Sequence, residues 1–107
     1  MENGKLLVLT VCDSGFVISS MMANKIEELL LPLKHDVSVV SLLPISVESF
    51  VTHNNVDFIV TTSPIPGEIH VPIINGLPLL TGFNEQALND QIFELAQEIL
   101  RKYSGNG

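Results

Sequence analysis

Short apolar runs and one alternating segment along the chain predict four strands. Leu6 to Val11 is almost entirely apolar, which is typical of a strand buried on both faces of a parallel sheet. Two more apolar runs predict strands at Val56 to Thr61 and Val71 to Ile74, and side chains that alternate between two faces predict another at Asp36 to Leu43. The first strand should lie in the centre of the sheet because it is short and apolar, whereas Pro72 favours an edge position for the fourth.

Apolar residues spaced three and four apart predict helices between these strands. The first is expected to begin at Ser19 or Ser20, with a serine as its N-cap, and to end just before Pro32. Ser46 to Thr52 predicts a short helix capped by Ser46. The last helix should follow Asn84 as its N-cap, and its apolar stripe should consist of Leu88, Ile92, Leu95, Ile99 and Tyr103.

The order of these elements predicts an α/β fold with an open, four-stranded, mostly parallel sheet and helices on both faces, in a Rossmann-like or phosphatase-like topology. Leu77 to Leu80 is apolar but contains Pro78, so we expect an extended segment outside the ladder. With 107 residues, 46% of them hydrophobic, residues 1–107 are interpreted as one domain with one core.

The only cysteine, Cys12, directly follows the first predicted strand and precedes a short loop with glycine and serine. The N-terminus of the following helix offers backbone N–H groups and a positive dipole end, which favour a thiolate and bind phosphate. We therefore predict that Cys12 is a nucleophile. The predicted phosphate-binding residues are the eight that follow it: Asp13, Ser14, Gly15, Phe16, Val17, Ile18, Ser19 and Ser20.

This loop lacks a group that cysteine-dependent phosphatases need. Their loop has an arginine six positions after the cysteine, where this chain has Ile18, and no basic residue lies between Lys5 and Lys25. The loop could therefore hold a phosphoryl group on sulfur but is poorly equipped to hydrolyse it. This pattern favours a phosphoryl carrier over a phosphatase, and a failure to hydrolyse p-nitrophenyl phosphate would exclude the phosphatase.

Composition and charge narrow the possible partners. The 12 acidic and 5 basic residues give a formal net charge of -7, which argues against binding to nucleic acid or to an anionic membrane surface. A single cysteine excludes an internal disulfide and a multi-cysteine zinc site, and no metal is expected. No signal peptide and no apolar run of membrane-spanning length are recognisable, so we predict a cytoplasmic protein.

Cys12 to Ile26 resembles the phosphocysteine loop and first helix of IIB components of the bacterial sugar phosphotransferase system, especially the galactitol type. The final segments of that group are similar to Val71 to Gly76 and to Leu77 to Leu80 followed by Thr81 and Gly82. The resemblance covers nearly the whole chain. Its most specific parts are the loop with two adjacent serines, the helix start after it and the Thr-Gly segment.

The resemblance implies that Cys12 accepts a phosphoryl group from a histidine of the IIA component and passes it to a sugar or sugar alcohol held by the membrane-embedded IIC component. IIA and IIC would be its partners, and neither a metal nor an organic cofactor is implied. Two residues depart from the family pattern, since Asp13 is acidic and Ile18 carries no hydroxyl. The alternative is a IIB-like regulatory module, in which phosphorylation of the cysteine reports sugar flux without transport.

Other polar residues allow more than one interpretation. Thr61, Thr62 and Ser63 either cap the end of the third strand or lie beside the phosphate loop. The three histidines, at positions 35, 53 and 70, are expected at the surface without a catalytic role.

Overall fold

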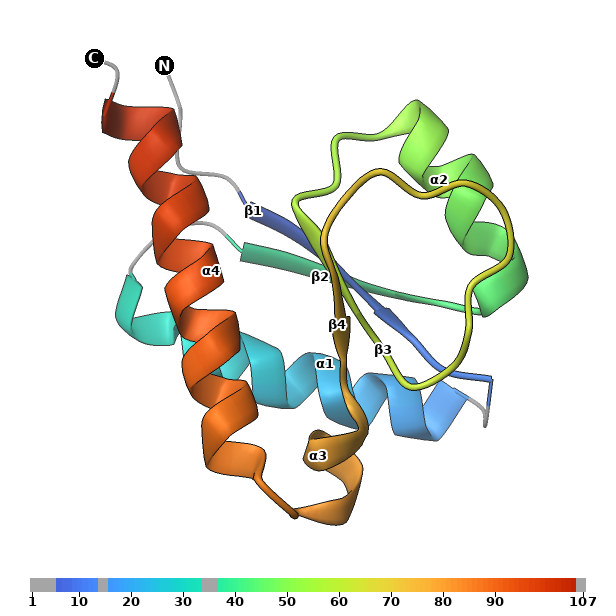
Figure 1. Cartoon of the computed structure of the whole chain (residues 1–107), viewed down its shortest axis with the longest axis horizontal. Coiled ribbons are helices and arrows are strands. Elements are labelled where there is room, and N and C mark those ends of the chain that lie inside the picture. Colours follow the sequence, from blue (N-terminus) through green and yellow to red (C-terminus); the bar gives the residue numbers. More distant parts are fainter. Residues whose placement is uncertain (1–5, 14–15, 34–36, 106–107) are drawn as a thin grey trace.

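The structure is a computed structural model that describes residues 6–13, 16–33 and 37–105, and it confirms the α/β fold. Its four strands are β1 (Leu6–Val11), β2 (Val37–Leu42), β3 (Phe58–Thr61) and β4 (Ile73–Asn75). They form one parallel sheet in the order β2-β1-β3-β4 (Figure 1). As predicted, the first strand is central and the fourth lies at an edge.

The central strand is buried on both sides because its apolar side chains alternate between two clusters. Leu6 and Val8 belong to the cluster on one face of the sheet, whereas Leu9 and Val11 belong to the cluster on the other. This alternation follows from the pleat of a strand, in which successive side chains point to opposite faces. A nearly continuous apolar run is therefore what a strand covered on both faces requires.

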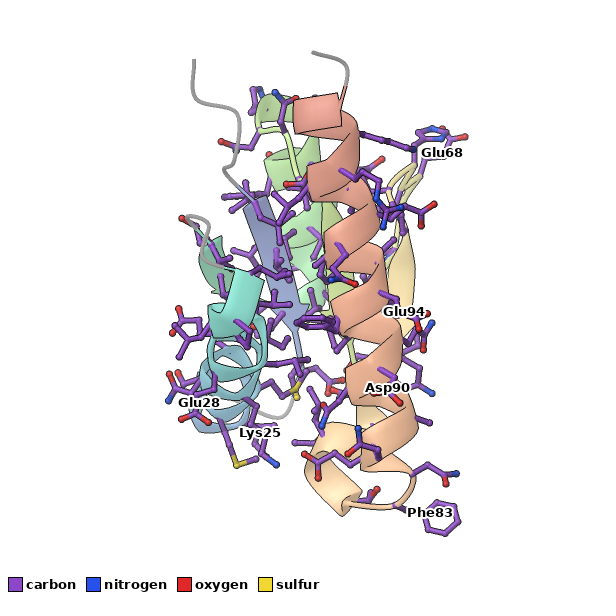
Figure 2. All side chains as sticks on the ribbon, turned by 90° about the vertical axis from the view of Figure 1, so that its left-hand side faces the viewer. Lys25, Glu28, Glu68, Phe83, Asp90 and Glu94 are labelled. Atoms are coloured by element: carbon purple, nitrogen blue, oxygen red, sulfur yellow. The ribbon has the colours of Figure 1, made fainter. Side chains whose placement is uncertain are left out.

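Helices cover both faces of the sheet. The larger cluster lies under α1 (Phe16–Leu30) and α4 (Glu85–Gly105), and the smaller one lies under α2 (Val47–His53) and the loop after β3. Glu28 and Phe83 project away from the protein interior (Figure 2). In the part of the chain that the structure describes, no helix has both the length and the apolar character needed to cross a membrane.

The predicted start of the first helix is wrong. The helix begins at Phe16, so Ser19 and Ser20 lie inside it and neither serves as its N-cap. The reason is that its apolar stripe extends one turn further back: Ile18 is half-buried and packs against the cluster that contains Met22. The predicted C-terminus is confirmed, because α1 ends at Leu30 and Pro32 falls in the 3₁₀ turn that follows.

The segment after β4 also differs from the prediction. Residues Leu77–Thr81 form a short helix, α3, instead of an extended segment. Pro78 lies in its first turn, where the missing backbone N–H removes no helical hydrogen bond. Asn75 Oδ1 accepts a hydrogen bond from the Leu77 N–H at 3.0 Å, and Gly82 ends the helix with a left-handed φ of 79°. A hydrogen bond at each end, with the Gly82 N–H donating to the backbone oxygen of Pro78 at the second, thus stabilises this short helix.

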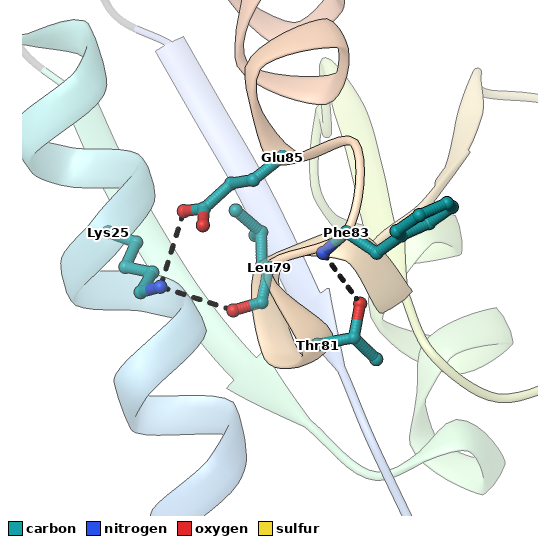
Figure 3. Close-up of polar contacts among 5 residues, drawn as sticks. All are labelled: Lys25, Leu79, Thr81, Phe83 and Glu85. Carbon is teal, nitrogen blue, oxygen red and sulfur yellow. Dashed lines mark hydrogen bonds and ion pairs between the residues drawn. The ribbon is translucent and has the colours of Figure 1, made fainter.

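Polar contacts also hold the junction between α3 and α4. Lys25 Nζ on α1 donates to the backbone oxygen of Leu79 at 3.1 Å and lies 3.3 Å from Glu85 Oε2 (Figure 3). The Phe83 N–H donates to Thr81 Oγ1 at 3.1 Å. The ion pair is partly exposed, so we expect it to contribute at most about 1 kcal/mol to stability.

Two details of the remaining helices correct the sequence prediction. Ser46 directly precedes α2 but forms no side-chain cap, because its backbone is helical and continues the preceding 3₁₀ turn, Pro44–Ser46. The last helix begins after Asn84 as predicted, but its buried stripe differs from the expected one and consists of Leu88, Ile92, Ala96 and Leu100. Leu95 and Ile99 are only partly buried and flank this stripe, and the side chain of Tyr103 lies outside the described residues.

Candidate functional site

Cys12 lies at the C-terminal edge of the sheet, directly after the central strand β1. The register pairs Val11 at the end of β1 with Thr61 at the end of β3. The loops that follow these two strands therefore start at the same level of the same edge (Figure 1). Cys12 and the loop that begins at Thr62 therefore share the edge where open α/β sheets place their sites.

Two hydrogen bonds, one between backbone groups and one to a side-chain hydroxyl, connect the turn after β3 to the residues on either side of Cys12. The Thr62 N–H donates to the backbone oxygen of Val11 at 3.0 Å. The Asp13 N–H donates to the hydroxyl oxygen of Ser63 at 3.3 Å. The backbone before Cys12 and the backbone after it are thus both held by the same turn.

This turn is itself closed by a side chain at the end of β3. Thr61 Oγ1 donates to the backbone oxygen of Ser63 at 2.7 Å and accepts a hydrogen bond from the Ser63 N–H at 3.1 Å. Thr61 therefore caps the strand end, and Thr62 and Ser63 lie beside Val11 and Asp13, whereas the phosphate-binding role of the loop after Cys12 stays a prediction. Ser63 was not among the predicted phosphate-binding residues. The sequence signal for its position is that parallel strands end at the same edge of a sheet, which brings the turn after β3 beside the cysteine.

Cys12 and the residue that follows it differ in their exposure to solvent. Cys12 is 0% exposed, whereas Asp13 is exposed to solvent. Burial alone is common for a structural cysteine, so it is the position at the strand end that marks Cys12 as a candidate nucleophile. Because Asp13 is exposed, water would screen the repulsion between its carboxylate and any anion bound at this loop.

The other predicted phosphate-binding residues fall into two groups. Phe16, Val17, Ile18, Ser19 and Ser20 form the N-terminal part of α1, while Ser14 and Gly15 lie outside the described residues. The first N–H groups of a helix have no partner within it, so this backbone can bind an anion. Ile18 packs against the core, so its side chain contributes to packing and not to a polar site.

The burial of Cys12 predicts that its thiol reacts slowly with reagents in solution. We expect Ellman's reagent to react with the native protein at least about a hundredfold more slowly than with the protein unfolded in guanidinium, because the reagent meets a buried cysteine only after local opening. The measurement is the rate of absorbance change under both conditions at one pH. Equal rates would show that the sulfur is accessible in the native fold, contrary to the structure.

Two of the three histidines, His53 and His70, lie within the described residues, and both are exposed. His53 lies near the C-terminus of α2 with its Nδ1 2.9 Å from the backbone oxygen of Ser49. His35 lies outside the described residues. Within residues 6–13, 16–33 and 37–105, no group of three or more His, Cys, Asp or Glu side chains is arranged to hold a metal ion.

Comparison with known proteins identifies the family. No protein-family model matches the chain. It is similar to a protein of Escherichia coli (strain K12) that is described as "Putative phosphotransferase enzyme IIB component SgcB". The two are 33% identical over 85 residues, which are 79% of this chain and 90% of that protein. At this identity and coverage, the chain belongs to the IIB components of the phosphotransferase system.

Proposed function

We propose that this protein is a phosphoryl carrier of a sugar phosphotransferase system and that Cys12 is the residue that carries the phosphoryl group. The observation that supports this most strongly is the place of Cys12, the only cysteine of a IIB component, at the C-terminal end of the central strand. A nucleophile at that edge can face a partner protein while the sheet holds its backbone.

In the first step, the Cys12 sulfur attacks the phosphorus atom of a phosphohistidine on the IIA component. The N–P bond breaks as the S–P bond forms, and the proton of the thiol ends on the departing imidazole. No metal or organic cofactor is needed, because the phosphoryl group passes directly between two side chains. Since Cys12 is buried, the sulfur must become accessible when the donor binds.

In the second step, a hydroxyl group of a sugar or sugar alcohol held by the membrane component IIC attacks the phosphorus atom. The S–P bond breaks, an O–P bond forms, and the hydroxyl proton ends on the sulfur, which restores the thiol. The resemblance to the galactitol-type group makes a sugar alcohol such as galactitol the first substrate to test. A reduced thiol is required in each cycle, in keeping with a cytoplasmic location.

The loop from Asp13 to Ser20 would bind the phosphoryl group between the two steps. Backbone N–H groups at the start of α1 and the dipole of that helix favour a dianion there. Ile18, at the position where a phosphatase has arginine, packs against the core, so no guanidinium at this position clamps the phosphoryl oxygens for hydrolysis. A bound phosphoryl group that is protected from hydrolysis is what a carrier requires.

The test is transfer in a reconstituted system. The protein is incubated with phosphoenolpyruvate, the general phosphotransferase proteins and a cognate IIA component, and its intact mass is measured. We expect the mass to rise by one phosphoryl group, and to fall back when membranes with IIC and the sugar alcohol are added. A mass that does not change, in a mixture where IIA itself is phosphorylated, would contradict the proposed function.

A further inference from the structure

We propose that Ser63 is a positioning residue for phosphoryl transfer: its hydroxyl holds the Asp13 amide and thereby fixes the backbone that carries Cys12. This inference rests on the proposed function, since it concerns the same transfer. It adds a residue outside the loop that follows the cysteine, from a turn 50 positions away from Asp13 in the chain.

The first support is the geometry around Cys12. The hydroxyl of Ser63 accepts the Asp13 N–H at 3.3 Å, and the neighbouring Thr62 N–H donates to Val11 at 3.0 Å. The peptide units on both sides of the cysteine are thus attached to one turn. Because only two soft backbone dihedrals belong to each residue, attachment on both sides restricts the direction of the Cys12 side chain.

The second support is that Ser63 is itself immobilised. It is 8% exposed, and both of its backbone polar groups bond to Thr61 Oγ1, at 2.7 Å and 3.1 Å. Thr61 in turn is paired with Val11 in the ladder between β1 and β3. The hydroxyl of Ser63 is therefore a fixed acceptor that is tied to the central sheet.

The third support is what the transfer demands. Attack on phosphorus requires the sulfur in line with the departing nitrogen, and small displacements of a reacting group are costly. A fixed Asp13 amide also keeps the first peptide after the cysteine in a constant place relative to the phosphoryl oxygens. The Ser63 hydroxyl contacts the Asp13 amide in the structure, so we assign its action to this backbone.

The experiment measures the transfer rate and the apparent KM for phosphorylated IIA in Ser63→Ala. We expect the maximal transfer rate to fall about tenfold or more while KM changes less than about twofold, because the sulfur is misplaced and the docking surface is intact. Ser63→Thr, which keeps the hydroxyl, should recover most of the rate. In Ser63→Ala, hydrogen exchange of the Asp13 amide should also become faster.

The matched control is Ser41→Ala. Ser41 Oγ lies 3.0 Å from Thr10 Oγ1, so this variant also removes a side-chain hydrogen bond to β1, but not one at the peptides that flank Cys12. It should keep the wild-type rate. Thr61→Val, which unlocks Ser63 without removing its hydroxyl, should slow transfer, and the double variant Thr61→Val/Ser63→Ala should be no slower than Ser63→Ala alone.

The outcomes separate this inference from the proposed function. A Ser63→Ala protein that is folded and transfers at the wild-type rate overturns the positioning role, even though Cys12 is phosphorylated. Equal slowing by Ser41→Ala and Ser63→Ala also overturns it, because the effect would then be general loosening of the sheet. If Ser63→Ala melts below the assay temperature, Thr61→Val is used instead: slower transfer supports the positioning role, and transfer at the wild-type rate overturns it. A wild-type protein that is never phosphorylated contradicts the proposed function instead.

Discussion

Replacing Cys12 with serine is expected to lower phosphoryl transfer from IIA at least about a thousandfold, the scale on which loss of a nucleophile acts. The reason is chemical: a thiol is partly ionised near neutral pH, whereas a serine hydroxyl is not and is a far weaker nucleophile without a base beside it. The fold should survive, because sulfur and oxygen differ little in size. The measurement is the initial rate of mass gain or of label incorporation.

A second variant separates chemistry from packing. Cys12→Ala should be as inactive as Cys12→Ser, and both should show the wild-type far-ultraviolet circular dichroism spectrum. Label that persists in the serine variant at more than a trace would assign the phosphoryl group to another residue. If either variant is unfolded under the assay conditions, phosphoryl transfer is compared with the wild type at a lower temperature where the variant is folded.

Replacing Phe58 with alanine is expected to cost about 3–5 kcal/mol of the free energy of unfolding, the range for truncating a buried aromatic side chain. Among the side chains that the structure describes, Phe58 is the largest that is fully buried, and it belongs to the cluster between the sheet and the helices α1 and α4. Domains of this kind have about 5–15 kcal/mol in total, so the variant should be close to unfolding. Urea denaturation followed by circular dichroism measures the difference.

Phe83 provides the matched control. It is 74% exposed and projects away from the protein interior (Figure 2), so Phe83→Ala should change the free energy of unfolding by no more than about 0.5 kcal/mol. The two variants remove the same side chain from opposite environments. Similar midpoints in urea for both would show that the core lies elsewhere than the structure places it.

Much of the fold could be predicted from the sequence, because its strongest signal is burial on both faces of the sheet. The apolar run Leu6 to Val11 predicted a central parallel strand, and the strand is central. The errors fall where local rules compete with tertiary packing. Ser19 and Ser20 are good caps, yet the core contact of Ile18 extends the helix before them, and Ala96 was missed because its importance lies in being small.

The place of the candidate site could be predicted from the sequence, but its detailed contacts could not. That Cys12 stands at the edge with the loop after β3 follows from the rule that parallel strands end together. The contact between Asp13 and Ser63 does not follow from that rule, because it depends on the register between β1 and β3, which long-range packing sets. The complete burial of Cys12 is likewise a property of the assembled fold.

The most direct measurement of the central claim is to locate the phosphoryl group on the protein. After phosphorylation by IIA, proteolysis under conditions that preserve the modification, followed by fragmentation in the mass spectrometer, identifies the residue. The account predicts a single phosphoryl group bonded to sulfur, on the peptide that contains Cys12. A phosphoryl group on His53, on His70 or on any residue other than Cys12 would contradict it.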